Sequence, residues 1–123
     1  MPLSAQQQGR VFRRLALEAA RAADDKKAEE VVVLHVRPVS GVCDYLVLAT
    51  CTSKPQLEAV EDAVKRRLKD DGVLALHRDG RLSDRWRVLD YGGLIVHIMH
   101  PETRAFYRLD TVYAGAKKVR WEA

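Results

Sequence analysis

The chain has 123 residues, of which 47% are hydrophobic and 31% charged, and its formal net charge is +4. This length suits one domain and is too short for two, and the composition is that of a globular protein, which excludes a disordered or fibrous chain. No apolar run approaches the roughly 20 residues of a membrane-spanning helix, and the N-terminus lacks a signal-peptide pattern. We therefore expect one cytoplasmic domain over residues 1–123, with its core at about 4–113 and a basic C-terminal tail at 114–123.

The first elements follow from capping and periodicity. Ser4 and Gln7 match a capping box, and apolar residues then recur at helical spacing as far as Ala23, which predicts a helix. Two strands are expected next, at residues 31–36 and 45–50, because the first run is β-branched and the second continuously apolar.

A second helix should begin after Thr52 or Ser53, either of which can cap it, and end at Gly72. Residues 73–76 suggest a short strand. The polar stretch at residues 77–84 is then expected to be a loop with a turn in it.

The clearest local motif is a predicted hairpin, with strands at residues 86–91 and 94–99 joined by Gly92 and Gly93. A two-residue glycine loop suits the positive φ values of a tight hairpin turn, and it fixes the register of the two strands. The expected pairs are Asp90 with Ile95, Val88 with His97, and Trp86 with Met99.

The register also divides the hairpin into two faces, since opposed residues share a face and so do alternate residues along a strand. The core face carries Leu89, Tyr91, Leu94, Val96 and Ile98, with Arg87 at its edge. The other face carries Trp86, Val88, Asp90, Ile95, His97 and Met99. That second face mixes an indole, a carboxylate and an imidazole, as a partner-binding surface does. The alternative is that helices cover both faces and Trp86 is a core residue.

Pro101 should open a last helix capped by His100, with Phe106 and Leu109 turned inward. The element order is then helix, two strands, helix, three strands, helix. This order predicts an α/β sandwich built on one mixed sheet of about five strands.

Cys43 and Cys51 flank the strand at residues 45–50. Eight extended residues span about 26 Å, whereas a disulfide needs Cα atoms within about 7 Å. Two buried, unreactive thiols in a reducing compartment are therefore expected.

Motifs for catalysis or cofactor binding are missing from the sequence, which has neither a phosphate-binding glycine loop nor a nucleophile elbow. No acidic residue is followed two positions later by another, the spacing at which strand carboxylates can share a metal pair. His97 and His100 are three apart and cannot share a metal on one strand, and His35 approaches His97 only if their strands are neighbours. We expect no enzyme activity, no cofactor and no metal.

One long motif resembles a known family. The segment from Arg85 to Gly92 reads RWRVLDYG, and residues 95–107 contain VH, HPETR and FY; both are similar to the Iojap/RsfS family of ribosomal silencing factors. Residues 28–50 resemble the same family, so the similarity covers roughly residues 10 to 115. The resemblance implies a fold similar to nucleotidyltransferases without their catalytic residues. It also implies binding to the universal large-subunit protein numbered fourteen, which blocks subunit joining and represses translation under nutrient limitation.

By this resemblance, Trp86, Asp90 and Tyr107 match interface positions of the family, and Arg87 and Tyr91 complete the candidate partner-binding set. Three residues depart from the family pattern. Arg87 stands where an aliphatic residue or threonine is more frequent, Gly93 replaces a common aspartate, and Cys51 replaces a frequent glycine. Loss of the aspartate would weaken any charge pairing at the hairpin tip.

Two alternatives to a steric binding module stay open at this point. Fold-level analogy alone would favour an active nucleotidyltransferase. A direct RNA-binding protein, or a secondary contact with ribosomal RNA, would use the two basic groups of the chain. These groups are Lys65, Arg66, Arg67 and Lys69, and then Lys117, Lys118 and Arg120 beside Trp121. Whether the free protein forms a homodimer is also left open.

Overall fold

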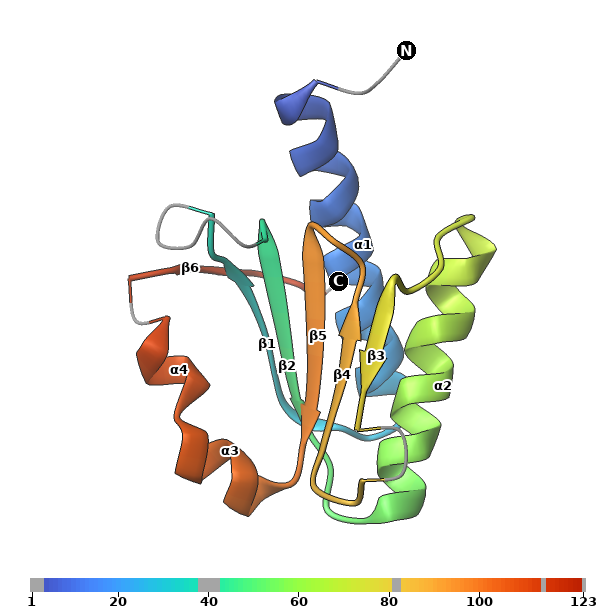
Figure 1. Cartoon of the computed structure of the whole chain (residues 1–123), viewed down its shortest axis with the longest axis vertical. Helices are drawn as coiled ribbons and strands as arrows, with labels where there is room; N and C mark the ends of the chain where they lie inside the picture. Colours follow the sequence, from blue (N-terminus) through green and yellow to red (C-terminus); the bar gives the residue numbers. More distant parts are fainter. Residues whose placement is uncertain (1–3, 38–42, 81–82, 114, 123) are drawn as a thin grey trace.

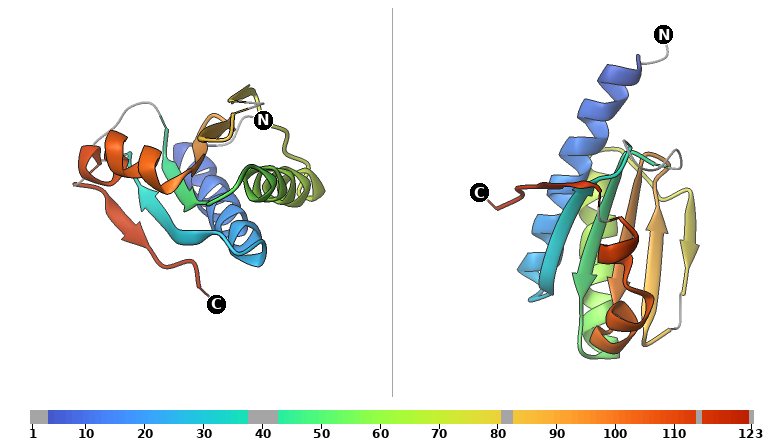
Figure 2. Two further views of the ribbon diagram at one scale, coloured as in Figure 1. Left: turned by 90° about the horizontal axis from the view of Figure 1, so that it is seen from below. Right: turned by 90° about the vertical axis from the view of Figure 1, so that its left-hand side faces the viewer.

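The computed structural model describes residues 4–37, 43–80, 83–113 and 115–122. It contains one mixed sheet in the strand order β3-β4-β5-β2-β1-β6, with β2 and β5 parallel and the other neighbours antiparallel. The strands are β1 (Glu29–His35), β2 (Tyr45–Thr50), β3 (His77–Asp79), β4 (Trp86–Asp90), β5 (Leu94–Met99) and β6 (Lys117–Val119). The helices are α1 (Ala5–Asp25), α2 (Lys54–Asp70), α3 (Pro101–Tyr107) and α4 (Leu109–Val112). Figures 1 and 2 show α1 and α2 on one face of the sheet and α3 and α4 on the other.

Both long helices begin and end as their sequences predict. The Ser4 hydroxyl accepts a hydrogen bond from the Gln7 backbone N–H, and the Gln7 side-chain oxygen accepts one from the Ser4 backbone N–H. The capping box of α1 is therefore confirmed. Ser53 is the residue that caps α2. Gly72 follows the end of α2 with a φ of 80°, the left-handed conformation that glycine adopts without steric cost.

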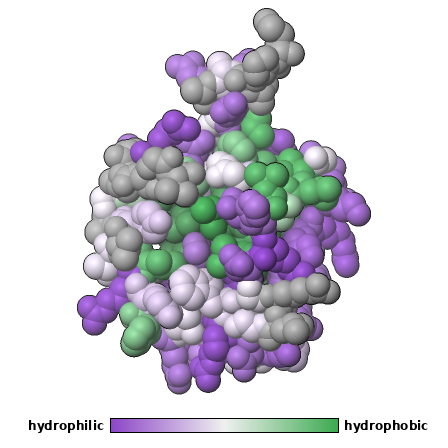
Figure 3. All heavy atoms as spheres, in the orientation of Figure 1, coloured by the Kyte–Doolittle hydropathy of each residue, from purple (hydrophilic) through white to green (hydrophobic). Residues whose placement is uncertain are grey.

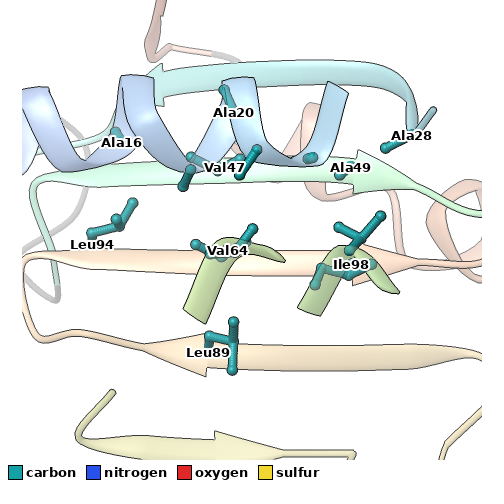
Figure 4. Packing of buried hydrophobic residues seen from close by; sticks show 14 of the residues in the cluster. Ala16, Ala20, Ala28, Val47, Ala49, Val64, Leu89, Leu94 and Ile98 are labelled. Atoms are coloured by element: carbon teal, nitrogen blue, oxygen red, sulfur yellow. The ribbon is translucent and has the colours of Figure 1, made fainter. Parts of the chain in front are cut away.

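The main core lies between these two helices and the sheet. Small side chains let α1 approach closely: Figure 4 shows Ala20 facing Val47 of β2, while Val64 of α2 lies over β5. Leu89 and Ile98, both fully buried, complete this layer. Cys51, for which the sequence offers no explanation, is also fully buried in this core.

A second, smaller core lies on the other face, towards the β1 side of the sheet. It consists of Leu34, Val36, Cys43, Leu46 and Leu48, against which Leu109, Tyr113 and Ala116 pack. The inward position predicted for Leu109 is therefore confirmed. Because α3 and α4 cover only this part of the second face, the part formed by β3 and β4 is left without a covering helix.

The predicted hairpin register is confirmed at all three pairs: Trp86 with Met99, Val88 with His97, and Asp90 with Ile95. Gly92 has a φ of 87°, as a tight turn requires. Gly93 needs to be glycine for a different reason. A Cβ atom there would lie 2.3 Å from the ring of Phe12, which packs on the turn from α1. The position of the Phe12 ring therefore explains why glycine stands here in place of the family's frequent aspartate, whose side chain would have to displace the ring.

The prediction for residues 73–84 is wrong in two respects. Residues 73–76 form no strand, while the polar segment His77–Asp79, predicted as loop, forms β3 and pairs with β4. Its side chains are all exposed at the sheet edge, so backbone pairing defines this strand and no hydrophobic pattern marks it. Residues 81 and 82 of the predicted loop lie outside the described residues.

The sheet has six strands where about five were predicted, and the sixth comes from the segment assigned to a basic tail. Strand β6 pairs with β1, with Val119 opposite Val33. Beyond it, the indole Nε1 of Trp121 donates to the Val31 carbonyl at 2.9 Å, and Arg21 of α1 donates to the Trp121 carbonyl at 3.1 Å. The strand pairing and these two hydrogen bonds hold residues 117–121 against β1 and α1. None of the helices formed by the described residues is long and apolar enough to span a membrane.

Candidate functional site

Four rings from three elements, β4, β5 and α3, meet on the second face of the sheet. Trp86 contacts Tyr107 of α3 with ring centroids 4.7 Å apart, and His97 of β5 with centroids 5.7 Å apart. Phe106 meets Tyr107 edge to face at 5.1 Å. We call these four residues, Trp86, His97, Phe106 and Tyr107, the aromatic surface. Figure 3 views this face and shows hydrophobic side chains at its centre among hydrophilic ones.

Phe106 and Tyr107 are exposed although they are large, with 77% and 49% of their surfaces open to solvent. The inward position predicted for Phe106 is therefore wrong. Adjacent residues of a helix point about 100° apart, and in α3 the buried direction is taken by Arg104, which is 7% exposed. The residue that α3 buries is an arginine, so hydrophobicity alone could not indicate which side of this helix faces inward.

Arg104 anchors α3 and thereby positions these rings. Its Nη1 donates to the Glu30 carbonyl at 2.6 Å and to the Thr50 hydroxyl at 2.9 Å. The helix begins with His100, whose Nδ1 accepts from the Glu102 backbone at 3.3 Å, so the predicted cap is confirmed. Two polar anchors therefore hold a seven-residue helix that buries little apolar surface of its own.

Trp86 is oriented by a hydrogen bond from its indole Nε1 to His97 Nδ1, 3.0 Å long. The imidazole must be neutral at Nδ1 to accept this bond. Burial lowers the pKa of His97 from 6.5 to about 4, because a buried ring pays a desolvation penalty when it becomes charged. The ring is thus neutral near pH 7 and keeps the indole in place.

A pH dependence of stability follows from this lowered pKa. Well above pH 6.5, His97 is neutral in both the folded and the unfolded chain, and its full contribution to stability is present. As pH falls from 6.5 to about 4, the unfolded chain takes up a proton and the folded one does not, so the free energy of unfolding should fall by about 3 kcal/mol. Urea unfolding at a series of pH values measures this. The His97→Gln variant should lose less stability across this window, and an unchanged slope would show that other groups cause it.

Asp90 lies at the hairpin end of the same face as Trp86. Its Oδ1 accepts from the Gly92 backbone at 2.8 Å, so the carboxylate stabilises the turn and is also partly exposed. Replacement by asparagine keeps this acceptor and removes the charge. Asp90→Asn is therefore the variant that separates a charge contact with a partner from support of the hairpin.

Arg87 and Tyr91, the other two candidate residues, lie on the opposite face and are buried, being 2% and 4% exposed. Arg87 Nη1 donates to Glu61 of α2 at 3.1 Å and its Nε to the Ser83 carbonyl at 3.0 Å. Burial, and then the nearby Glu61, raise the pKa of Tyr91 to about 12. Neither side chain contacts the aromatic surface, so neither residue forms part of it.

The thiols and imidazoles behave as structural groups. Cys43 and Cys51 are unpaired and buried, as predicted. Burial is the main cause that raises the pKa of each thiol to about 11, which keeps the sulfur protonated and unreactive. His35 lies on β1 and His97 on β5, with β2 between them. Among the described residues, no three His, Cys, Asp or Glu side chains cluster closely enough to hold a metal ion.

Comparisons with known proteins agree on one family. The sequence model described as ribosomal silencing factor during starvation matches residues 10–123. The chain is 32% identical over 104 residues to the ribosomal silencing factor RsfS of Halalkalibacterium halodurans, covering 85% of this chain and 89% of that one. It is 32% identical over 110 residues to the chloroplastic protein Iojap of Arabidopsis thaliana, covering 85% of this chain and 43% of the relative.

Solved structures show the same likeness in three dimensions. A crystal structure of a protein from Chromobacterium violaceum matches with a TM-score of 0.81 and 26% identity, covering 86% of this chain and 88% of the other. A protein from Bacillus halodurans matches with a TM-score of 0.76 and 30% identity, covering 88% and 98% of the two chains.

Proposed function

This chain belongs to the ribosomal silencing factor family, and we propose that it represses translation by binding the large ribosomal subunit and blocking its union with the small one. The proposed partner is the universal large-subunit protein numbered fourteen, as the family resemblance implies. The protein acts in the cytoplasm under nutrient limitation, as a bound obstacle and without catalysis.

The aromatic surface is the observation that carries this proposal. Trp86 and Tyr107 are large and rigid, and tryptophan and tyrosine are enriched among the residues that dominate interface energies. Their rings contact each other and lie partly open to solvent, although twenty residues separate them in the sequence. Phe106, exposed beside them, adds apolar area that a partner would bury. Asp90 provides a charge at the edge of the same face.

The size of the domain suits a steric mechanism. A standard interface hides about 800 Å² on each partner, and a folded protein of 13.9 kDa bound on a docking surface is too bulky for close contact of two subunits. The effect needs no active site. The likeness to nucleotidyltransferases and direct RNA binding through the two basic groups both stay predictions. Trp121, the aromatic residue beside the second of these groups, packs against the core.

Sedimentation with separated bacterial subunits tests the first step. The labelled protein should travel with the large subunit and not with the small one. Asp90→Asn should weaken this binding, more at low salt than at high salt, because screening shortens the reach of an exposed charge. The proposal is wrong if the protein travels with the small subunit alone or with neither.

A further inference from the structure

A second surface feature lies on the α2 side of the sheet, away from the aromatic surface. It is a groove of about 330 Å³ between the last turns of α2 and the connection from α2 to β3. Lys65, Arg66 and Lys69 line one side, residues 73–75 line the other, and Tyr91 contributes to the lining. We call it the basic groove. Figure 3 shows hydrophobic side chains at the upper right, where Figure 1 places this connection.

The cations of the basic groove are largely uncompensated. Lys65 lies 4.0 Å from the buried carboxylate of Glu61. Arg66 and Lys69 form no ion pair with any residue that the structure describes. Two neighbouring positive charges without a counter-charge attract an anionic group.

Tyr91 adds a hydrogen-bonding group to the groove. The residue is 4% exposed, and its hydroxyl has no hydrogen-bond partner within residues 4–37, 43–80, 83–113 and 115–122. Because Tyr91 lines the groove and its hydroxyl oxygen is open to solvent, an occupant can bond this hydroxyl in place of water.

The other side of the groove is apolar and exposed. Leu74 is 67% exposed, as is Leu76 beyond it. The backbone of this connection is held by a bond from Leu76 N to the Asp90 carbonyl at 2.7 Å. The leucines therefore stand on a fixed segment beside the cations.

These features favour a peptide over a nucleic acid. Single-stranded RNA is bound by cations together with aromatic faces on which bases stack, and the one aromatic ring of this groove is buried. Leucines offer no stacking surface, but they suit an apolar side chain. We propose that the basic groove binds an acidic peptide segment, whose carboxylates meet Arg66, Lys69 and the Tyr91 hydroxyl while an apolar side chain packs on Leu74.

This inference does not rest on the proposed function. Tyr91, which follows β4, belongs to the main core, whereas Trp86 lies on the second face of the sheet, so both surfaces can be occupied at once. It can therefore fail while ribosome binding holds, or hold while ribosome binding fails.

Fluorescence anisotropy with the full chain tests the proposal. The probe is a short labelled peptide in which glutamates flank a leucine. It should bind saturably and more weakly as salt rises. The same peptide with lysine in place of glutamate should not bind, and the peptide with serine in place of leucine should bind more weakly.

Variants locate the binding on the protein. The double change Arg66→Glu with Lys69→Glu should weaken binding at least about tenfold, since it makes two attractive charges repulsive. The matched control is Lys117→Glu with Lys118→Glu, which changes the net charge equally and should leave binding within about twofold. Tyr91→Phe removes only the hydroxyl and should weaken binding about fivefold, the worth of one hydrogen bond. Thermal melting of each variant confirms that it is folded.

Three outcomes would overturn the proposal. The acidic peptide should saturate the wild-type chain, and absence of saturable binding would contradict the proposal. Equal losses in the groove and control variants would mean that net charge alone attracts the peptide. Tighter binding of an oligouridylate RNA or of phosphatidylglycerol vesicles, lost on the same double change, would assign the groove to a different ligand.

Discussion

Replacing Glu61 with alanine should lower the free energy of unfolding by about 3–5 kcal/mol, the cost of leaving a buried charge without its partner. The Glu61 and Arg87 side chains are 1% and 2% exposed, and their ion pair spans 3.1 Å. Arg78 and Lys65 converge on the same carboxylate. Without it, three cations would meet around a buried site. Chemical denaturation followed by circular dichroism measures the loss.

Glu58 offers a matched control, because it pairs with the same Arg87 at 3.5 Å but is 52% exposed. Glu58→Ala should cost less than about 1 kcal/mol, as exposed ion pairs usually do. Replacing Glu61 and Arg87 together by leucine and methionine should recover much of the loss, because no buried charge is then left unpaired. A Glu61→Ala variant as stable as the Glu58→Ala variant would contradict this account of the pair.

The second large effect is on partner binding. Trp86→Ala and Tyr107→Ala should each weaken binding to the large subunit by about 2 kcal/mol or more, which is roughly thirtyfold. Each change removes a ring from the contact that joins β4 to α3. Quantitative sedimentation with the large subunit gives the affinity.

Leu74→Ala is the control for these two variants, since it also truncates a large exposed side chain, but beside the basic groove. It should leave large-subunit binding unchanged. Circular dichroism must show that the tested variants keep the native fold. If Trp86→Ala unfolds the domain, Trp86 is a core residue and the assignment of this face fails.

The hairpin shows how far sequence reasoning reaches. Its two-residue glycine turn determines the register, and the register determines which side chains share a face. Trp86, Asp90 and His97 could therefore be placed together from the sequence alone. Tyr107 could be added only by family resemblance. Its contact with Trp86 depends on where α3 docks, and that docking depends on Arg104 reaching Thr50, a contact between residues 54 positions apart.

Strands at the sheet edges were the least predictable elements. Both β3 and β6 have three residues, most of them exposed, and both are defined by backbone pairing with a neighbour. Neither has the alternating apolar pattern from which strands are recognised. The role of Arg87 was also hidden, because an arginine on a core face is explained only by Glu61, which lies on another element.

Subunit joining in the presence of the protein tests the central claim most directly. Separated bacterial subunits are mixed with increasing amounts of the chain, and the joined ribosomes are quantified on a sucrose gradient. The yield should fall with concentration, recover partly when small subunits are added in excess by mass action, and stay high when the ribosomes are joined beforehand. Normal joining while the protein remains bound to the large subunit would contradict the account.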